Sequence, residues 1–132
     1  MQVKEAMVYR DEIITALSSI TVEEAMKILA INRVGSLILI GDDDKLDGII
    51  TSRDLLQAVA TFGSKGLEKT LNEIMSVKLL VVHENDNIKI AIEKMEEFYT
   101  HHILVKDNSG EICGLLSSYD IVRECSMESI AF

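Results

Sequence analysis

Two short stretches of the sequence carry residue types that bind ligands, at matching spacing. They read GIITSRD from Gly48 and GLLSSYD from Gly114, so each places an aspartate three positions after a hydroxyl residue. A strand that ends in such a stretch and leads into a helix presents free backbone N–H groups and a favourable dipole to an anion such as phosphate. The carboxylates of Asp54 and Asp120 can accept hydrogen bonds from both hydroxyls of a ribose, as acidic residues do in other nucleotide sites. The glycines would let a ligand approach the backbone closely.

The same residue types also have a purely structural explanation. Thr51 with Asp54, and Ser117 with Asp120, have the spacing of capping pairs at a helix N-terminus, which are common and imply no ligand. Capping and ligand binding are compatible. The pattern alone therefore leaves open whether a ligand site is added to the caps.

Catalytic and metal-binding chemistry is not indicated. The Ser, Cys and His residues fall in no recognised arrangement of a nucleophile and a base. The two matched aspartates could in principle act as acid and base, but each stands in a separate copy of the repeated stretch. Cys113 and Cys125 lack the CxxC spacing of a zinc site. We therefore expect no catalytic residue and no metal ligand.

Composition and charge exclude further classes of protein. The 132 residues are 48% hydrophobic, enough for a folded core, and the formal net charge of −9 would repel a nucleic acid. No apolar run approaches the roughly 20 residues of a membrane-spanning helix, and the first residues lack the apolar region of a signal peptide. These features predict a cytoplasmic protein that binds neither nucleic acid nor membrane.

A repeat extends well beyond the two short stretches. A shift of 66 positions pairs residues 22–57 with 88–123 without a gap, and both copies are apolar at the i, i+3, i+4 and i+7 positions of a first helix. Two short apolar runs separated by turn-forming residues follow in each copy. Each copy is thus predicted to contain helix, strand, turn, strand and helix. A leading strand is expected at 12–17 and 78–83, where the equivalence between copies is loosest.

The repeat suggests boundaries along the chain. We expect a first repeat over 1–62, a linker over 63–69 and a second repeat over 70–132. The linker prediction rests on FGSKG at 62–66, which is rich in glycine and serine. A short helix should follow, with Thr70 and Glu73 as its capping pair.

The two copies together resemble a tandem pair of cystathionine-β-synthase (CBS) domains. The resemblance rests on the alanine of the first helix, the strand pair after it, and the terminal Gly-apolar-apolar-Thr/Ser-x-x-Asp, twice at fixed spacing. It implies an α/β (α+β) fold of two β-α-β-β-α repeats packed through their sheets about a pseudo-two-fold axis. It also implies clefts between the repeats that bind adenosine compounds such as AMP, ADP, ATP, S-adenosylmethionine or NAD.

The resemblance assigns roles to individual residues. Asp54 and Asp120 would hold ribose hydroxyls, and Thr51 and Ser117 would meet ribose or phosphate. Because each cleft is completed by the other repeat in this family, Ile14 would flank the adenine near Asp120, and Leu80 the adenine near Asp54. Groups that would face phosphates are Gly35, Ser36, Arg53, His101 and His102.

The copies differ at two of these places. The second copy has His101 and His102 where the first has Gly35 and Ser36, and Tyr119 replaces Arg53, so the clefts need not be alike. Arg53 has an alternative role as a solvated residue in surface ion pairs. The proline that is frequent before the second strand in this family is absent.

These expectations lead to a function. The chain is predicted to be a stand-alone sensor that binds an adenine nucleotide as a regulatory ligand and signals to a separate protein. A homodimer is expected, with candidate surfaces on the last helix of each repeat: Leu55, Leu56 and Val59, and Ile121, Val122 and Cys125. The alternative is a structural interaction module whose clefts bind nothing, and an enzyme is a third class.

Overall fold

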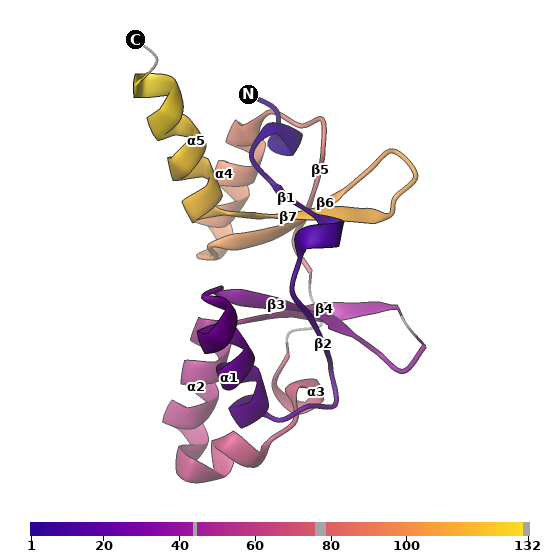
Figure 1. The fold of residues 1–132 in the computed structure, drawn as a ribbon, viewed down its shortest axis with the longest axis vertical. Helices are drawn as coiled ribbons and strands as arrows, with labels where there is room; N and C mark the ends of the chain where they lie inside the picture. Colours follow the sequence, from indigo (N-terminus) through magenta and orange to yellow (C-terminus); the bar gives the residue numbers. More distant parts are fainter. Residues whose placement is uncertain (44, 76–78, 131–132) are drawn as a thin grey trace. The chain divides into compact units, whose positions relative to one another are not determined.

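The computed structural model describes residues 1–43, 45–75 and 79–130, and side chains within these ranges except those of Asp47 and residues 126–130. The chain divides into two compact units. One comprises Met1–Ile13 with Leu79–Phe132, and the other comprises Ile14–Lys78. Figure 1 shows both units, each with a small sheet and its helices. The predicted mixed α/β composition is therefore confirmed.

The unit formed by Ile14–Lys78 has a three-stranded sheet in the order β2-β3-β4. Strand β2 (Thr15–Leu17) is parallel to β3 (Ser36–Ile40), and β3 is antiparallel to β4 (Leu46–Thr51). Helices α1 (Val22–Asn32) and α2 (Ser52–Phe62) lie on the same face of this sheet (Figure 1). Their apolar faces and the inner face of the sheet form one core, which includes Val22, Ala25, Leu37, Leu39, Ile50, Leu55 and Leu71.

The other unit has the same plan with one additional strand. Its sheet has the order β1-β7-β6-β5, in which β5 (Val81–His83) is parallel to β6 (His102–Lys106) and β6 is antiparallel to β7 (Ile112–Ser117). The unit also contains helices α4 (Ile88–Phe98) and α5 (Ser118–Ile130). The core includes Val3, Met7, Val82, Ala91, Met95, Ile103, Val105, Leu116 and Ile121.

The 66-residue repeat holds at the level of single residues and extends further than the sequence indicated. β2 and β5, α1 and α4, β3 and β6, and β4 and β7 all begin and end 66 positions apart. The strand register repeats as well, since Ser36 pairs with Thr51 and His102 pairs with Ser117. The expectation of a loose equivalence in the leading strand was therefore wrong: β2 and β5 keep the same offset. Lys78, the first residue of the expected strand 78–83, lies outside the described residues.

Local sequence explains where the first helix of each unit begins and ends. Thr21 accepts a hydrogen bond from the Glu24 amide at 3.2 Å, and Asn87 accepts one from the Lys89 amide at 3.0 Å. Both are favoured N-cap residues. Both helices end at a left-handed residue that is not glycine, Arg33 (φ 54°) and Tyr99 (φ 52°). The repeat therefore preserves a backbone conformation that side-chain identity does not reveal.

The N-terminal segment packs with the second repeat, although the sequence repeats were drawn from residue 1. Strand β1 (Val8–Tyr9) pairs with β7, with Tyr9 opposite Gly114. A Cβ at Gly114 would lie 2.6 Å from Met7 Sδ and 2.9 Å from the Val8 carbonyl oxygen. What approaches the Gly114 backbone is therefore the N-terminal strand of the same unit, where the sequence suggested a ligand.

The segment expected to be a linker is a packed element. Residues Gly63–Glu68 form the 3-10 helix η3, and the short helix α3 (Leu71–Ile74) follows, with the Thr70 amide donating to Glu73 at 3.3 Å. Gly66 is buried, and a Cβ there would lie 2.7 Å from the Ala58 carbonyl oxygen on α2. Both η3 and α3 belong to the compact unit of the first repeat. The compact units therefore follow boundaries that differ from the repeats drawn on the sequence.

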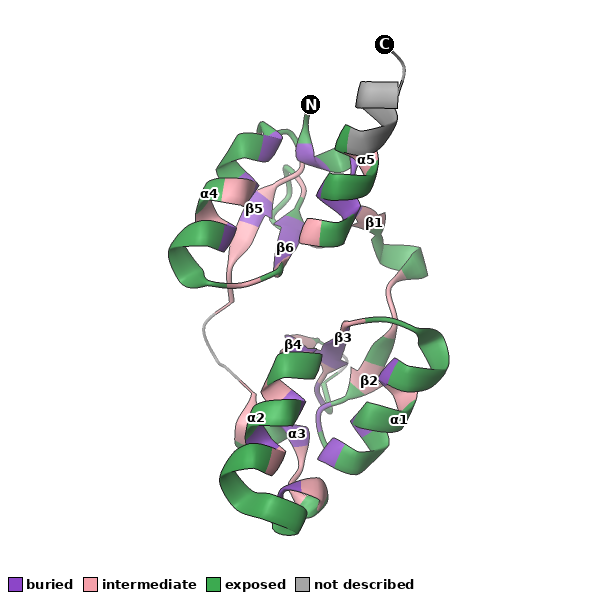
Figure 2. Cartoon of the chain, turned by 90° about the vertical axis from the view of Figure 1, so that its left-hand side faces the viewer, coloured by how far each residue is buried: buried purple, intermediate pink, exposed green. Residues whose placement is uncertain are grey.

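The apolar surfaces of the last helices are smaller than the sequence suggested. Leu55 is 2% exposed and Ile121 is 7% exposed because both contribute to the cores, and Val59 packs against the core as well. Leu56 and Val122 remain exposed, at 70% and 61%. Figure 2 shows this division along α2, where buried and exposed residues alternate around the helix.

Candidate functional site

The predicted residues of the first repeat gather at one edge of the sheet β2-β3-β4. Ser36 begins β3 and pairs with Thr51, which ends β4. The Ile14 carbonyl, just before β2, accepts a hydrogen bond from the Ile38 amide at 3.2 Å, and the Gly35 carbonyl accepts one from the Ser52 amide at 3.0 Å. Helix α2 begins at this edge and carries Asp54 in its first turn. We call this edge the Asp54 half-site.

The second repeat builds the same edge from its own residues. His102 pairs with Ser117, and the Leu80 carbonyl accepts a hydrogen bond from the Leu104 amide at 3.0 Å. The His101 carbonyl accepts one from the Ser118 amide at 2.9 Å. Helix α5 begins here and carries Asp120, so we call this edge the Asp120 half-site.

Reciprocal capping contacts organise each half-site. In the first, Asp54 Oδ2 accepts hydrogen bonds from the Thr51 amide at 2.8 Å and the Thr51 hydroxyl at 2.9 Å, and the Asp54 amide donates to Thr51 Oγ1 at 3.3 Å. In the second, Asp120 Oδ2 accepts from the Ser117 amide at 2.9 Å and its hydroxyl at 2.8 Å. The Asp120 amide donates to Ser117 Oγ at 3.1 Å. The structural interpretation of the repeated motif, as a pair of capping boxes, is therefore confirmed.

The capping contacts reduce what the helix N-termini can offer to an anion. The first amide of α2, from Ser52, donates to Gly35, and the third, from Asp54, donates to Thr51. Helix α5 repeats both contacts through Ser118 and Asp120. Two of the first three amides of each helix are thus already bonded within the protein. An anion at these helix ends would depend on the second amide and on side chains.

The two aspartates differ in their second carboxylate oxygen. Asp120 Oδ1 lies 3.4 Å from Nη2 of Arg123, one turn along α5, and the Asp120 side chain is only 7% exposed. Asp54 is partly buried, and within the described parts of the chain its Oδ1 has no hydrogen-bond or ion-pair partner. The position equivalent to Arg123 is Gln57, an exposed neutral residue. The first half-site therefore keeps an oxygen available to a donor that the second half-site shares with a guanidinium.

The residue pattern and the geometry agree with one protein family. The model of the CBS domain family matches residues 3–61 and 71–126. The chain belongs to the CBS domain family. Both of its repeats are matched, so the resemblance inferred from the sequence is confirmed, and with it the fold of a tandem CBS pair.

Known proteins resemble this chain over most of its length. The L-aspartate semialdehyde sulfurtransferase of Methanocaldococcus jannaschii is 34% identical over 110 residues, which are 83% of this chain and 21% of that protein. The structure of the CBS domain pair of protein MJ0100, in complex with 5-methylthioadenosine and S-adenosyl-L-methionine, is 30% identical. It has a TM-score of 0.81 and covers 97% of this chain and 98% of its own.

A second ligand complex is similar. The CBS domain protein PAE2072 of Pyrobaculum aerophilum, complexed with AMP, is 28% identical with a TM-score of 0.78, covering 91% of this chain and 89% of that one. The chain spans between about a fifth and three fifths of the length of the first curated relatives that it matches. CBS pairs in similar proteins thus bind adenosine compounds.

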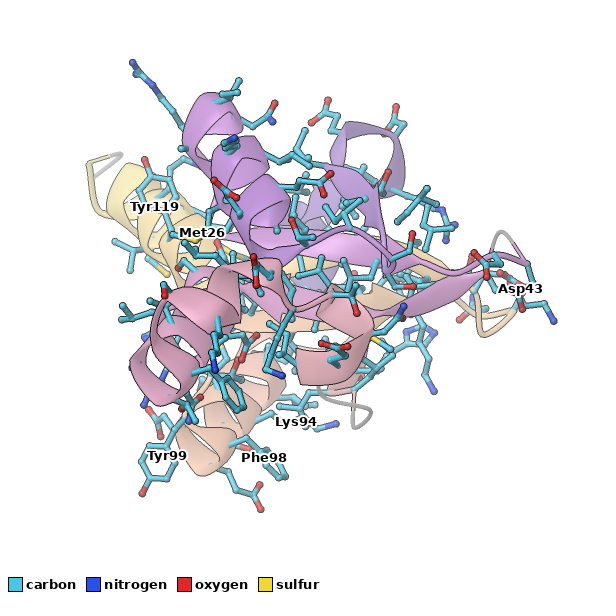
Figure 3. All side chains as sticks on the ribbon, turned by 90° about the horizontal axis from the view of Figure 1, so that it is seen from below. Met26, Asp43, Lys94, Phe98, Tyr99 and Tyr119 are labelled. Carbon is cyan, nitrogen blue, oxygen red and sulfur yellow. The ribbon has the colours of Figure 1, made fainter. Side chains whose placement is uncertain are left out.

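The remaining predicted residues of the CBS repeats have defined places. Arg53 and Tyr119, the second residues of α2 and α5, are both exposed, and Tyr119 stands away from the ribbon in Figure 3. His101 is exposed, with Nδ1 3.2 Å from Ser118 Oγ, whereas His102 and Ser36 are less exposed as the first residues of their strands. Ile14 lies in the unit of Asp54 and Leu80 in the unit of Asp120. Their expected roles near the opposite aspartates remain predictions.

Sequence reasoning missed Arg123. The signal was present, because an aspartate and an arginine three residues apart on a helix lie on the same face. Tyr119 adds to this arrangement, since the Arg123 guanidinium lies 5.9 Å from the centre of its ring. The charge of the Asp120 half-site therefore depends on a residue outside the repeated motif.

Two kinds of feature are absent from the described residues. Within 1–43, 45–75 and 79–130, no group of three or more His, Cys, Asp and Glu side chains is placed to hold a metal ion. None of the helices in that part of the chain is long and apolar enough to cross a membrane.

Proposed function

We propose that this CBS pair is a regulatory module that binds an adenosine-containing ligand at its Asp54 and Asp120 half-sites. The observation that carries the proposal is the pair of sheet edges in matching register, each with an aspartate held by a hydroxyl neighbour. The adenosine compounds in the similar CBS pairs of MJ0100 and PAE2072 support the ligand class. In this role, the carboxylates accept hydrogen bonds from ribose hydroxyls.

The local charges favour ligands with few phosphates. The net charge is −9 with the histidines counted as neutral, and the arginines nearest to the two aspartates along their helices are Arg53 on α2 and Arg123 on α5. Because two early amides of each helix are already bonded, additional phosphates gain little from the helix ends. AMP or ADP should therefore bind at least as well as ATP, and S-adenosylmethionine and NAD belong in the same panel.

The regulatory output is a protein-protein event. A ligand can shift the protein between states only if it binds one state more tightly. The exposed side chains of Leu56 and Val122 are available for self-association, and we propose a cytoplasmic homodimer that signals to a separate protein. The adenosine ligand acts as a regulator, and no catalytic role is proposed for it or for the protein.

A structural module without a ligand is the second candidate. The capping boxes favour it, because capping alone accounts for every contact that the aspartates make with Thr51 and Ser117. In that case the motif stabilises the two helices and nothing binds.

Calorimetry and thermal shift with a ligand panel distinguish these functions. The panel comprises AMP, ADP, ATP, S-adenosylmethionine, 5-methylthioadenosine and NAD, with GMP as the control for the base. Saturable binding of at least one adenosine compound supports the proposal. Absence of binding across the panel, with no adenosine compound released from the purified protein in mass spectrometry, supports the structural module. Substrate turnover in the same samples would indicate an enzyme.

A further inference from the structure

We propose that Arg123 makes the two half-sites unequal, so that ribose recognition depends mainly on Asp54. This inference rests on the proposed function, since it specifies how that function is divided between the two aspartates. It assigns to Arg123, which lies outside the repeated motif, a positioning role that controls the carboxylate of Asp120.

The contacts of Asp120 leave little capacity for a ribose. A carboxylate offers about four lone-pair positions on its two oxygens. Oδ2 of Asp120 already accepts the amide and the hydroxyl of Ser117, and Oδ1 faces the Arg123 guanidinium at 3.4 Å. Ribose hydroxyls that approach Oδ1 would therefore share this oxygen with the Arg123 guanidinium.

Other contacts hold Arg123 beside the Asp120 carboxylate. Its Nε lies 3.5 Å from Glu124 Oε1, and its guanidinium lies 5.9 Å from the centre of the Tyr119 ring. Both contacts come from the same helix, so they do not require another part of the protein to be in place. The side chain remains 47% exposed, which allows the ion pair to open when a ligand displaces it.

The first repeat lacks this competitor. Three residues after Asp54 the chain has Gln57, which carries no charge, and Asp54 Oδ2 makes the same two contacts with Thr51 that Asp120 Oδ2 makes with Ser117. The two half-sites therefore match in their capping contacts and differ in the partner of the second oxygen. That difference predicts a stronger ribose contact at Asp54.

The repeat supplies a reciprocal test. We would compare AMP with 2′-deoxy-AMP, because the ratio of their dissociation constants reports the ribose contact and largely cancels effects on phosphate. As a single substitution, Asp54→Asn should remove most of the preference for AMP over 2′-deoxy-AMP. Asp120→Asn, also as a single substitution, should remove little of it. Arg123→Gln, which copies the first repeat, should increase the contribution of Asp120 to that preference about two- to fivefold, the range of an ion pair that solvent screens through its exposed arginine. Gln57→Arg should decrease the contribution of Asp54 by a similar factor.

A matched control excludes a general effect of charge. Lys27 forms an exposed i,i+4 pair with Glu23 at 3.9 Å, so Lys27→Gln removes one cation and one helical ion pair elsewhere and should leave the AMP preference unchanged. The inference would be overturned if Asp54→Asn and Asp120→Asn reduced the preference for AMP over 2′-deoxy-AMP equally. It would also be overturned if Arg123→Gln and Lys27→Gln changed this preference alike. The proposed function would stand in both cases. Failure of the unmodified protein to bind any adenosine compound would overturn both.

Discussion

The side chains of Thr51 and Asp54 each bond the backbone of the other: the Thr51 amide donates to Asp54 Oδ2 at 2.8 Å, and the Asp54 amide donates to Thr51 Oγ1 at 3.3 Å. Ser117 and Asp120 repeat the arrangement at 2.9 and 3.1 Å. The same carboxylates that could hold a ribose therefore stabilise the helices that carry them. A substitution that removes one role without the other is needed to separate capping from binding.

Asparagine provides that separation. Its side-chain oxygen can still accept from the Thr51 or Ser117 amide, so Asp54→Asn and Asp120→Asn should leave the melting temperature within a few degrees of the unmodified protein. The neutral oxygen is a weaker acceptor for ribose hydroxyls. At Asp54, loss of a charge-assisted hydrogen bond costs about 1.5 to 3 kcal/mol, which is roughly a tenfold to hundredfold rise in the dissociation constant for AMP, and Asp120→Asn should cause a much smaller rise.

Alanine serves as the contrasting variant. Asp54→Ala removes the cap and the ribose acceptor together, so it should lower the free energy of unfolding by about 0.5 to 2 kcal/mol and also weaken AMP binding. Urea unfolding and calorimetry measure the two effects. Unchanged AMP affinity in the Asp54→Asn, Asp120→Asn double variant would show that the repeated motif is architecture alone.

Features that depend on residues close together in the sequence could be predicted from it. The order of helices and strands followed from apolar periodicity, and the caps at Thr21, Thr51 and Asn87 followed from residue type and spacing. The strand register was not predicted, but it is the same in both repeats, since Ser36 pairs with Thr51 and His102 pairs with Ser117. These features depend on contacts within a few turns or on one hairpin.

Features that depend on contacts between residues far apart in the sequence could not be predicted from it. Strand β1 has only two residues, which is too short for a periodic pattern. The N-terminal segment is held to its unit by contacts between residues far apart in the sequence, such as the hydrogen bond from Arg10 Nη1 to the Ile112 carbonyl at 2.9 Å. The glycine-rich segment at 63–66 resembled a linker because glycine permits both flexible chain and close packing. The packing of Gly66 against Ala58 decides between them, and only the structure provides it.

Gly66 offers a test whose sign distinguishes a packed element from a flexible linker. In a flexible segment, Gly66→Ala would be neutral or would stabilise the protein by about 0.4 to 1 kcal/mol, because it restricts the unfolded chain. Here the new Cβ would lie 2.7 Å from the Ala58 carbonyl oxygen, so we expect destabilisation of about 1 to 3 kcal/mol. Ser64→Ala, at an exposed position in the same 3-10 helix, is the matched control and should have little effect on urea unfolding.

Gly114 tests the pairing of the N-terminal strand. A Cβ there would lie 2.9 Å from the Val8 carbonyl oxygen, which is backbone and cannot turn aside as a side chain can. Gly114→Ala should therefore displace β1, lower the free energy of unfolding by about 1 to 3 kcal/mol and expose residues 1–13 to proteases. Limited proteolysis with N-terminal sequencing measures the exposure, and Glu111→Ala, exposed just before β7, is the control. Equal cleavage rates in the two variants would contradict the role given to Gly114.

The thiol of Cys113 should be unusually unreactive. Burial, together with the Glu84 carboxylate 3.6 Å from the sulfur, raises the pKa of Cys113 from 9.0 to about 11. Because the thiolate is the reactive form, only about one molecule in a thousand is reactive at pH 8, against about one in ten for a thiol of pKa 9.0. In a Cys125→Ser background, alkylation by iodoacetamide should be about a hundredfold slower than that of a small model thiol and should rise through pH 10 to 11. Glu84→Gln removes the charge but keeps the burial, so the pKa should fall and the rate at pH 8 should increase several-fold. A rate for Cys113 that levels off near pH 9 in the unmodified Glu84 protein would show that burial and Glu84 do not control this thiol.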